Sequence, residues 1–383
     1  VVSDTNLDGL IKKLKPYNYV IIGFHKSNLH PWKSYKMSNK ELVWLQEIAK
    51  EKTVVLDVFT SPYSLLKIKS FTNIESVIVS YQNSKLSQEI SAQLLFGALA
   101  AKGKLPVSIG AEFKEGSGIT STNLSRFQYT LPEAAGLSSK KLALIDKMAD
   151  TIIQEKMAPG FQVFVARNGK VVFEKSYGYH TYDKKIKVKN PDIYDLASLT
   201  KILASLPLIM KAEEEVEIRL TANLRDVLPS FSNSNKDTVT VKEILSHFGR
   251  LKSWIPFYKD TQDSITGKNL GQFYRKQESN DFKTKVAENL FISESYKDSI
   301  LKYIKDADQN ENSGYGYSDL GYYIFKEVLE KTYNKPLDKL VDDTFYKSLG
   351  ANRTSYLPLH KFNKSEIVPT EKDDYFRDQL LHG

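Results

Sequence analysis

The stretch Asp195-Leu196-Ala197-Ser198-Leu199-Thr200-Lys201 opens an apolar helical pattern and contains the spacing Ser-x-x-Lys. Residues three apart on a helix share a face, so we expect the Ser198 hydroxyl and the Lys201 amine to meet. A serine hydroxyl is a weak nucleophile and needs an adjacent base. A buried lysine is suited to that role, because desolvation disfavours its ammonium form. Alone, the same spacing is also compatible with an N-capping serine followed by a surface lysine.

Further along the chain, Tyr317-Ser318-Asp319 lies in a glycine-rich segment just before another helical pattern. A phenol held close to a lysine cation loses its proton more easily, so Tyr317 is expected to relay protons to and from the Ser198 oxygen. Asp319 is expected to accept a hydrogen bond from Lys201. In a chain with 22 tyrosines, Tyr317 alone is compatible with simple aromatic packing. The order of the two stretches favours the catalytic interpretation.

Four stretches together carry a family resemblance: Pro159-Gly160-Phe161, residues 194–201, Leu245-Ser246-His247 and Tyr317-Ser318-Asp319. Through them, residues 137–383 resemble the serine β-lactamase/penicillin-binding-protein superfamily, and within it the class C-like esterases and D-aminopeptidases. The resemblance implies that Ser198 is the acylated nucleophile. It implies that Lys201 and Tyr317 are the proton-transfer pair, and that Asp319 contacts the substrate or the lysine. His247 is interpreted as a structural hydrogen-bonding residue at a helix end.

The third motif of that superfamily is Lys-Thr-Gly, or His-x-Gly in this branch, on a strand that lines the site and supplies an oxyanion-hole amide. No such motif follows Asp319, and the sequence ends at Gly383. A complete domain of the family would continue, so the resemblance implies a C-terminally truncated domain. We expect residues 1–383 alone to turn over substrate poorly or not at all.

Residues 1–110 alternate short β-branched runs with helical patterns. Strands are predicted at 19–24, 53–59 and 76–81, and helices at 38–50 and 87–101. Near-continuous apolar strands separated by helices indicate a mostly parallel sheet covered on both faces. The pattern therefore predicts an α/β three-layer sandwich.

The segment Gly103-Lys104-Leu105-Pro106-Val107-Ser108, with Ser61-Pro62-Tyr63 and residues 77–81, carries a second resemblance. It resembles the C-terminal α/β sandwich domain of family-3 glycoside hydrolases of the bacterial β-N-acetylhexosaminidase type. In that family the catalytic carboxylates lie in a preceding barrel domain. The resemblance implies that the parent chain carries this N-terminal barrel, which is missing here. No pair of carboxylates within 1–110 is nominated for glycosidic chemistry.

The domain organisation predicted from these patterns has three parts. Residues 1–110 form the α/β sandwich, residues 111–136 form a linker, and residues 137–383 form an incomplete α+β serine β-lactamase-like domain. The linker is predicted from its lack of hydrophobic periodicity and its content of Gly, Ser, Thr and Asn. Because the sequence begins at Val1 without Met and without a signal peptide, we interpret it as a processed or excised fragment.

Composition excludes several kinds of partner and chemistry. The chain has 383 residues and a net charge of +8 without a basic-aromatic stripe, so nucleic acid is not expected as a partner. It has no cysteine, which excludes disulfides, thiolate metal sites and cysteine nucleophiles. The six histidines show no metal-ligand spacing, so neither a metal nor another cofactor is expected. No apolar run approaches the ~18 residues of a transmembrane helix.

Three functions are compatible with the sequence. The first is serine acyl transfer on a D-amino-acid peptide, amide or ester, within a bifunctional peptidoglycan hydrolase of the periplasm or cell surface. The second is an accessory role to the β-N-acetylhexosaminidase barrel. The third is a non-catalytic module that binds wall fragments. For the first, the expected catalytic residues are Ser198, Lys201 and Tyr317, with Asp319 binding the substrate, either a small molecule or a piece of peptidoglycan.

Overall fold

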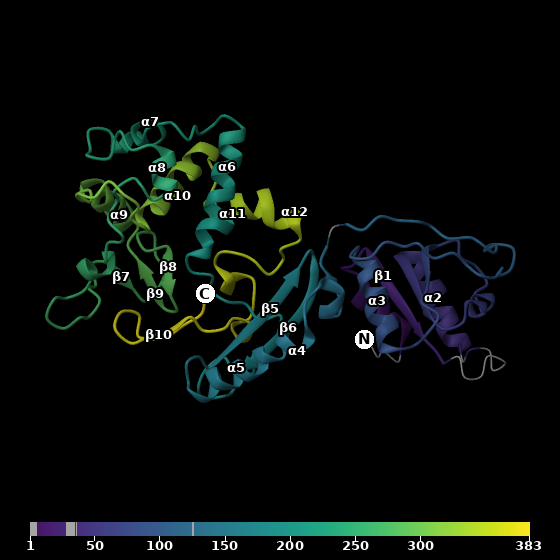
Figure 1. Cartoon of the computed structure of the whole chain (residues 1–383). Helices are drawn as coiled ribbons and strands as arrows, with labels where there is room; N and C mark the ends of the chain where they lie inside the picture. The colour runs from purple at the N-terminus through teal and green to yellow at the C-terminus, as the bar shows by residue number, and fades with distance from the viewer. Residues whose placement is uncertain (1–5, 28–34, 36, 125) are drawn as a thin grey trace. The chain divides into compact units, whose positions relative to one another are not determined.

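The computed structural model of this chain describes residues 6–27, 35, 37–124 and 126–383, so that His30 lies outside the described residues. The chain divides into two compact units (Figure 1). The first comprises Val1–Thr151 with Val163–Lys175, and the second Ile152–Gln162 with Ser176–Gly383. The division runs through helix α5 (Leu144–Gln154) and through both strands of a hairpin.

Three parallel strands form the first sheet, in the order β1-β2-β3. The strands are β1 (Tyr19–His25), β2 (Thr53–Phe59) and β3 (Ile74–Val79), and the helices around them are α1 (Leu7–Leu14), α2 (Asn39–Glu51), η2 (Pro62–Lys67) and α3 (Lys85–Leu95). Strand β2 lies in the middle, and its Val54, Leu56 and Val58 are fully buried. The three predicted strands and their parallel pairing are confirmed, while the three-layer sandwich stays a prediction.

Local sequence explains where two of these helices begin and end. The Ser38 side chain accepts from the Glu41 N–H, and the Glu41 carboxylate accepts from the Ser38 N–H; this capping box starts α2. The prediction of one helix over 87–101 is wrong, because α3 ends at Leu95. Gly97 then has a φ of +76°, a left-handed conformation that glycine adopts freely and that ends a helix.

Residues 111–136, the predicted linker, are partly hydrogen-bonded to the segment before them. The Leu124 N–H donates to the Gly97 carbonyl at 2.7 Å, and the Ser121 N–H donates to the Ala101 carbonyl at 3.0 Å. Strand β4 (Gln128–Tyr129) and helix η3 (Pro132–Ala135) follow. The domain boundaries at 110 and 136 stay a prediction.

A hairpin of β5 (Gly160–Arg167) and β6 (Lys170–Gly178) forms where Asn168-Gly169 predicts it. Both turn residues have positive φ, 50° and 72°, the conformation that a tight hairpin turn requires and that Asn and Gly tolerate. The sheet order is β4-β6-β5, with β4 parallel to β6. The short helix α4 (Ser139–Leu142) and α5 precede the hairpin.

The second unit is mainly helical and carries two small antiparallel sheets. Its helices are the π-helix η4 (Lys201–Ser205), α6 (Leu206–Glu214), α7 (Leu224–Val227), η5 (Pro229–Phe231), α8 (Val241–Leu245), η6 (Phe257–Thr261), α9 (Ser295–Asp306), α10 (Leu320–Tyr333), α11 (Leu337–Val341), the π-helix η7 (Asp342–Tyr346), α12 (Lys347–Leu349), η8 (Pro358–His360) and η9 (Lys364–Glu366). Its strands are β7 (Tyr274–Arg275), β8 (Thr284–Ala287), β9 (Leu290–Ile292), β10 (Glu371–Asp373) and β11 (Gln379–Leu381).

Helices α6, α8, α10 and α11 gather around one hydrophobic core (Figure 1). Leu208 of α6, Ile244 of α8 and Ile324 of α10 are buried in it. Gly321 lets α10 approach α8, because a Cβ there would lie 2.5 Å from the Ile244 Cγ2 atom. This close packing fixes the first turn of α10 and with it the segment that ends at Asp319.

The core of the second unit predicts a matched pair of stability changes on one helix. Leu208 is fully buried, so Leu208→Ala is expected to lower the free energy of unfolding by about 2–5 kcal/mol through lost burial and a cavity. Met210 on the same helix is 63% exposed, so Met210→Ala is expected to change it by less than about 0.5 kcal/mol. Urea denaturation followed by circular dichroism measures both. Equal losses for the two variants would contradict the placement of this helix.

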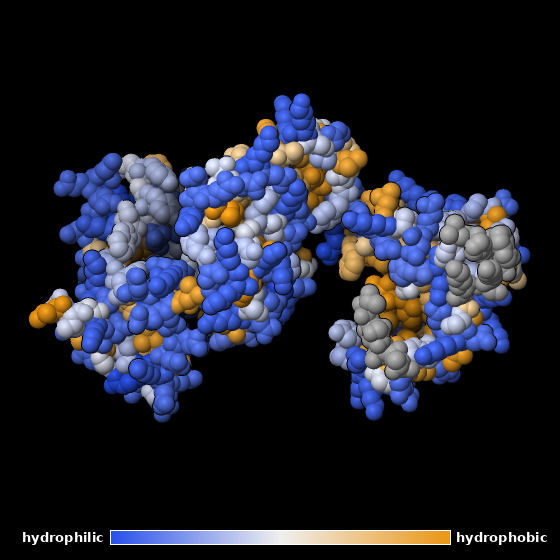
Figure 2. Space-filling model, turned by 90° about the horizontal axis from the view of Figure 1, so that it is seen from below, coloured by the Kyte–Doolittle hydropathy of each residue, from blue (hydrophilic) through white to orange (hydrophobic). Residues whose placement is uncertain are grey.

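The surface is mostly hydrophilic on the face that Figure 2 shows, with hydrophobic residues in small separate patches. Among the residues that the structure describes, no helix combines the length and the apolar character needed to cross a bilayer.

Candidate active site

A strained turn presents Ser198. The Asp195 carboxylate accepts from the Ala197 N–H at 2.7 Å, and the Leu199 N–H donates to the Leu196 carbonyl at 2.9 Å. Ala197 has a φ of +43°, a conformation that costs energy for a residue with a Cβ and that often marks functional sites. The π-helix η4 follows at Lys201–Ser205, and such wide turns are also frequent at functional sites.

The four residues predicted for the site lie together. Lys201 Nζ is 2.9 Å from Ser198 Oγ, and Tyr317 Oη is 2.9 Å from the same oxygen. Lys201 Nζ is also 2.6 Å from Asp319 Oδ1. Ser198 therefore has a cation and a phenol in hydrogen-bond contact with its hydroxyl oxygen, which is the arrangement that activates a serine nucleophile.

Two opposing influences act on the pKa of Lys201. Its side chain is only 14% exposed, and burial lowers the pKa of the ammonium, but the hydrogen bonds and charges of Asp319 and Tyr317 outweigh burial. The pKa of Lys201 is therefore raised. Asp319 Oδ1 is buried, and the Lys201 ammonium at 2.6 Å is what compensates its charge. Burial alone would favour a neutral Lys201, but the expected contact with Asp319 favours its charged form.

The segment that carries Tyr317 is hydrogen-bonded to the segment after α8. The Gly316 N–H donates to the His247 carbonyl at 2.9 Å, and the Ser318 N–H donates to His247 Nδ1 at 3.2 Å. At the next residue, the Asp319 N–H donates to the Ser253 carbonyl at 2.9 Å. The prediction that His247 is a hydrogen-bonding residue at a helix end is confirmed.

His247 is neutral at neutral pH. Burial lowers the pKa of its imidazole, and the nearby charge of Lys201 lowers it further. Its ring lies 4.6 Å from the ring of Tyr317, centre to centre, and edge-on to that of Tyr315. His247 thus touches the site through Tyr317 and does not contact Ser198 Oγ directly.

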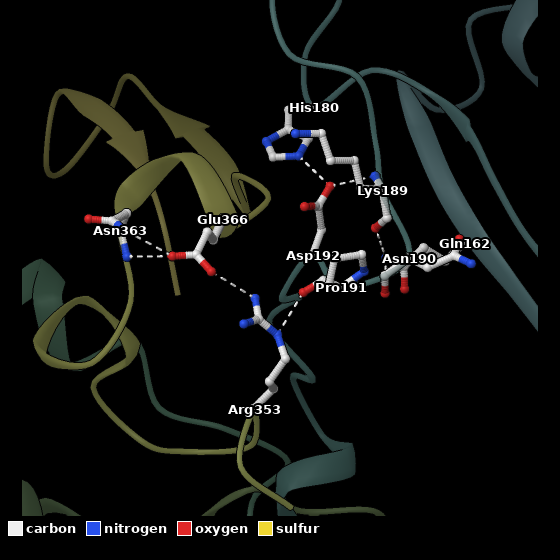
Figure 3. A network of polar contacts seen from close by, with 9 residues as sticks. All are labelled: Gln162, His180, Lys189, Asn190, Pro191, Asp192, Arg353, Asn363 and Glu366. Atoms are coloured by element: carbon white, nitrogen blue, oxygen red, sulfur yellow. Dashed lines mark hydrogen bonds and ion pairs between the residues drawn. The ribbon is translucent and has the colours of Figure 1, made fainter. Parts of the chain in front are cut away.

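A network of polar contacts holds the chain just before the turn at Ala197-Ser198 (Figure 3). The Asp192 carboxylate accepts from the His180 imidazole and from the Lys189 N–H, both at 2.7 Å, and the His180 and Asp192 side chains are almost fully buried. Arg353 Nε donates to the Pro191 carbonyl at 2.8 Å, and its guanidinium pairs with Glu366 at 3.1 Å. Pro191 and Asp192, which precede the turn at Ser198, are therefore held by contacts from two different parts of the chain.

Backbone contacts extend this support. The Ile193 N–H donates to the Glu366 carbonyl at 2.8 Å, and the Val368 N–H donates to the Ile193 carbonyl at 2.8 Å. Sequence analysis did not predict any of these supporting residues. No motif spacing marks them, and the contacts of Arg353, Glu366 and Val368 with Pro191 and Ile193 join segments more than 150 residues apart.

A cavity of about 520 Å³ adjoins the turn at Ala197-Ser198 and is bounded in part by Asp195, Leu196 and Thr200. The hydroxyls of Tyr194 and Ser355, which also bound it, are buried and have no hydrogen-bond partner among the described residues. Burial, with the charge of Asp192, raises the pKa of Tyr194 to about 12, so this phenol is a hydrogen-bond donor at neutral pH. No group of three or more His, Cys, Asp or Glu side chains within the described residues is arranged to hold a metal ion.

Comparison with known proteins gives one family match. The Beta-lactamase family model matches residues 149–364, which is more than half of the chain and includes Ser198, Lys201, Tyr317 and Asp319. Among solved structures, a penicillin-binding protein homologue from Pyrococcus abyssi is 17% identical with a TM-score of 0.46, covering 63% of this chain and 50% of that chain.

Curated relatives are similar over about two thirds of the chain. An N-acetylmuramyl-L-alanine amidase of Bacillus subtilis is 26% identical over 278 residues, which are 68% of this chain and 57% of that protein. A Salmonella paratyphi B protein, to which D-alanyl-D-alanine carboxypeptidase activity is attributed, is 27% identical over 260 residues, or 66% of this chain and 56% of that protein. The chain spans about half the length of the curated relatives it matches.

Proposed function

Because this chain belongs to the beta-lactamase family, we propose that it is a serine hydrolase that transfers acyl groups through Ser198. The observation that carries this proposal is the contact of Ser198 Oγ with both Lys201 Nζ and Tyr317 Oη, each at 2.9 Å. A surface lysine after an N-capping serine would not be accompanied by a tyrosine from a distant segment. The strained turn at Ala197 supports the same interpretation.

Each residue has a role in the proposed mechanism. Tyr317, as the phenolate, accepts the Ser198 proton while Oγ attacks the substrate carbonyl carbon. The Lys201 ammonium stabilises the phenolate and the developing negative charge, which is the role that a lysine with a raised pKa can fill. Tyr317 then gives the proton to the leaving amine or alcohol. Water then attacks the acyl carbon and loses a proton to Tyr317; Tyr317 passes this proton to Ser198 Oγ as the Oγ–acyl bond breaks, which releases the acid and restores the phenolate.

Asp319 is proposed to orient Lys201 and to face the substrate. Its Oδ1 contacts the lysine at 2.6 Å, while the side chain as a whole is 45% exposed. The second carboxylate oxygen is therefore available for a substrate N–H or hydroxyl group. An amide or peptide substrate supplies such a donor next to the carbonyl that Ser198 attacks.

The proposed substrates are D-amino-acid peptides, amides or esters derived from the bacterial cell wall. The relatives named above are an N-acetylmuramyl-L-alanine amidase and a protein to which D-alanyl-D-alanine carboxypeptidase activity is attributed. A periplasmic or cell-surface location would follow from such a substrate. The resemblance of residues 1–110 to a family-3 glycoside hydrolase domain supports the further proposal that the parent protein also cleaves wall sugars.

Matched stereoisomers test the substrate class. The chain should react covalently with a fluorescent penicillin or fluorophosphonate and should release product faster from a D-alanyl-D-alanine peptide than from its L-alanyl-L-alanine counterpart. Mass spectrometry of the intact protein should place the adduct on Ser198. Labelling without stereochemical preference would retain the serine hydrolase and overturn the wall-peptide substrate. Binding of wall fragments without any labelling would instead favour a non-catalytic module.

A further inference from the structure

The imidazole of His247 is placed to control where Tyr317 lies. Its Nδ1 accepts from the Ser318 N–H at 3.2 Å, its main-chain carbonyl accepts from the Gly316 N–H at 2.9 Å, and its ring packs against the Tyr317 ring at 4.6 Å. One residue thus contacts Tyr317 itself and the residues on both sides of it. The two hydrogen bonds from the Gly316 and Ser318 N–H groups fix residues 316–318, and the ring contact fixes the direction of the Tyr317 phenol.

We propose that His247 is a positioning residue whose neutral imidazole holds Tyr317 against Ser198, and that a proton on His247 releases Tyr317 and switches acylation off in acid. The proposal rests on the proposed serine hydrolase function and adds a regulator to the same site.

Protonation would remove the contact that holds the segment. An imidazolium carries hydrogens on both nitrogens, so Nδ1 could no longer accept from the Ser318 N–H. The hydrogen on Nδ1 and the hydrogen on the Ser318 nitrogen would then both lie between two nitrogens that are 3.2 Å apart. The groups that face His247 are Lys201, Asp319 and the phenols of Tyr315, Tyr317 and Tyr322. The ammonium of Lys201 opposes a second cation there, and the Asp319 carboxylate is already paired with it.

The direction of the pH effect follows from the environment of the imidazole. Burial and the charge of Lys201 lower the pKa of His247, so the neutral form persists below the ordinary value of about 6.5. Acylation should be constant near neutral pH and should fall as the pH drops through this lowered pKa.

Two substitutions of His247 separate its possible roles. His247 has a φ of +61°, a left-handed conformation that asparagine tolerates best among residues with a side chain, and the Asn Oδ1 atom can accept in place of Nδ1. His247→Asn should keep the acylation rate at pH 8 within about tenfold and should lose the acid limb, which is the fall in acylation rate at low pH. His247→Phe keeps the ring but not the acceptor, and should lower kcat on the order of 10²-fold, the cost of a misplaced catalytic group, with little change in KM.

The readout is the second-order rate of covalent labelling by a fluorescent penicillin between pH 4.5 and 8, with kcat and KM for an activated ester alongside. Arg250→Asn is the matched control, because Arg250 also has a left-handed φ, of +57°, but no titrating imidazole; it should retain the acid limb. An unchanged acid limb in His247→Asn would overturn the inference and leave the hydrolase intact. If the wild-type chain shows no labelling that depends on Ser198, the proposed function itself fails.

Discussion

Ser198→Ala is expected to abolish covalent labelling by penicillins and fluorophosphonates, and to lower hydrolysis of an activated ester by up to about 10⁶-fold, the loss seen when a serine hydrolase loses its nucleophile. The alanine side chain has no oxygen to attack the carbonyl, and no other serine stands in contact with both Lys201 and Tyr317 among the described residues. Binding of substrate should change little, because Lys201, Tyr317 and Asp319 remain. Intact-protein mass spectrometry and steady-state kinetics measure the two losses.

A second serine provides the control for this experiment. The Ser348 hydroxyl in α12 donates to the Phe345 carbonyl at 3.0 Å, as helical serines commonly do, and has no lysine or tyrosine partner in the described chain. Ser348→Ala should label and hydrolyse at the wild-type rate. Labelling that persists in Ser198→Ala would show that another residue is the nucleophile.

Lys201→Met is expected to lower kcat for the same ester on the order of 10²–10⁴-fold, the range for loss of a group that assists proton transfer. The substitution removes the cation that contacts Ser198 Oγ and leaves the Asp319 carboxylate without its counter-charge. Methionine retains most of the length and apolar surface of the lysine stem. The reaction should therefore slow chiefly in the acylation step, which single-turnover labelling resolves.

The matched control lies on the next turns of the same helical segment. Lys211 in α6 pairs with Glu215 on the surface, away from Ser198, Tyr317 and Asp319, so Lys211→Met should retain the wild-type kcat. The double variant Lys201→Met/Asp319→Leu removes the unpaired charge as well. It should recover stability without recovering activity; recovery of activity would mean that Lys201 serves only to neutralise Asp319.

The site illustrates what local spacing predicts and what it does not. The contact of Ser198 with Lys201 follows from their separation of one helical turn, and the meeting with Tyr317 follows from the order of the motifs in a known family. Sequence analysis expected Asp319 to accept from Lys201, and the two atoms lie 2.6 Å apart; how far this carboxylate offsets burial is not readable from an apolar pattern. The contact between His180 and Asp192 was missed for the same reason, since no motif joins them.

The fold shows a similar limit. Parallel strands were predictable from their apolar runs, and the hairpin from Asn168-Gly169. The extent of α3 was not, because Gly97 ends the helix by adopting a left-handed backbone, and an apolar run alone did not reveal this. In this fold the hydrophobic pattern predicted the strands, whereas the backbone conformation of a single residue, Gly97, caused the error in the length of α3.

The support of the nucleophile turn by Arg353, Glu366 and Val368 has a consequence for biosynthesis. A ribosome releases residues 189–198 long before residues 353–368, and chains fold in that order as they emerge. Until the later segment arrives, Ile193 has no backbone partner there, and closing so long a loop is slow. A nascent chain would thus carry Ser198 in an unformed turn, and acylation competence should appear only after the last of these residues has left the exit tunnel.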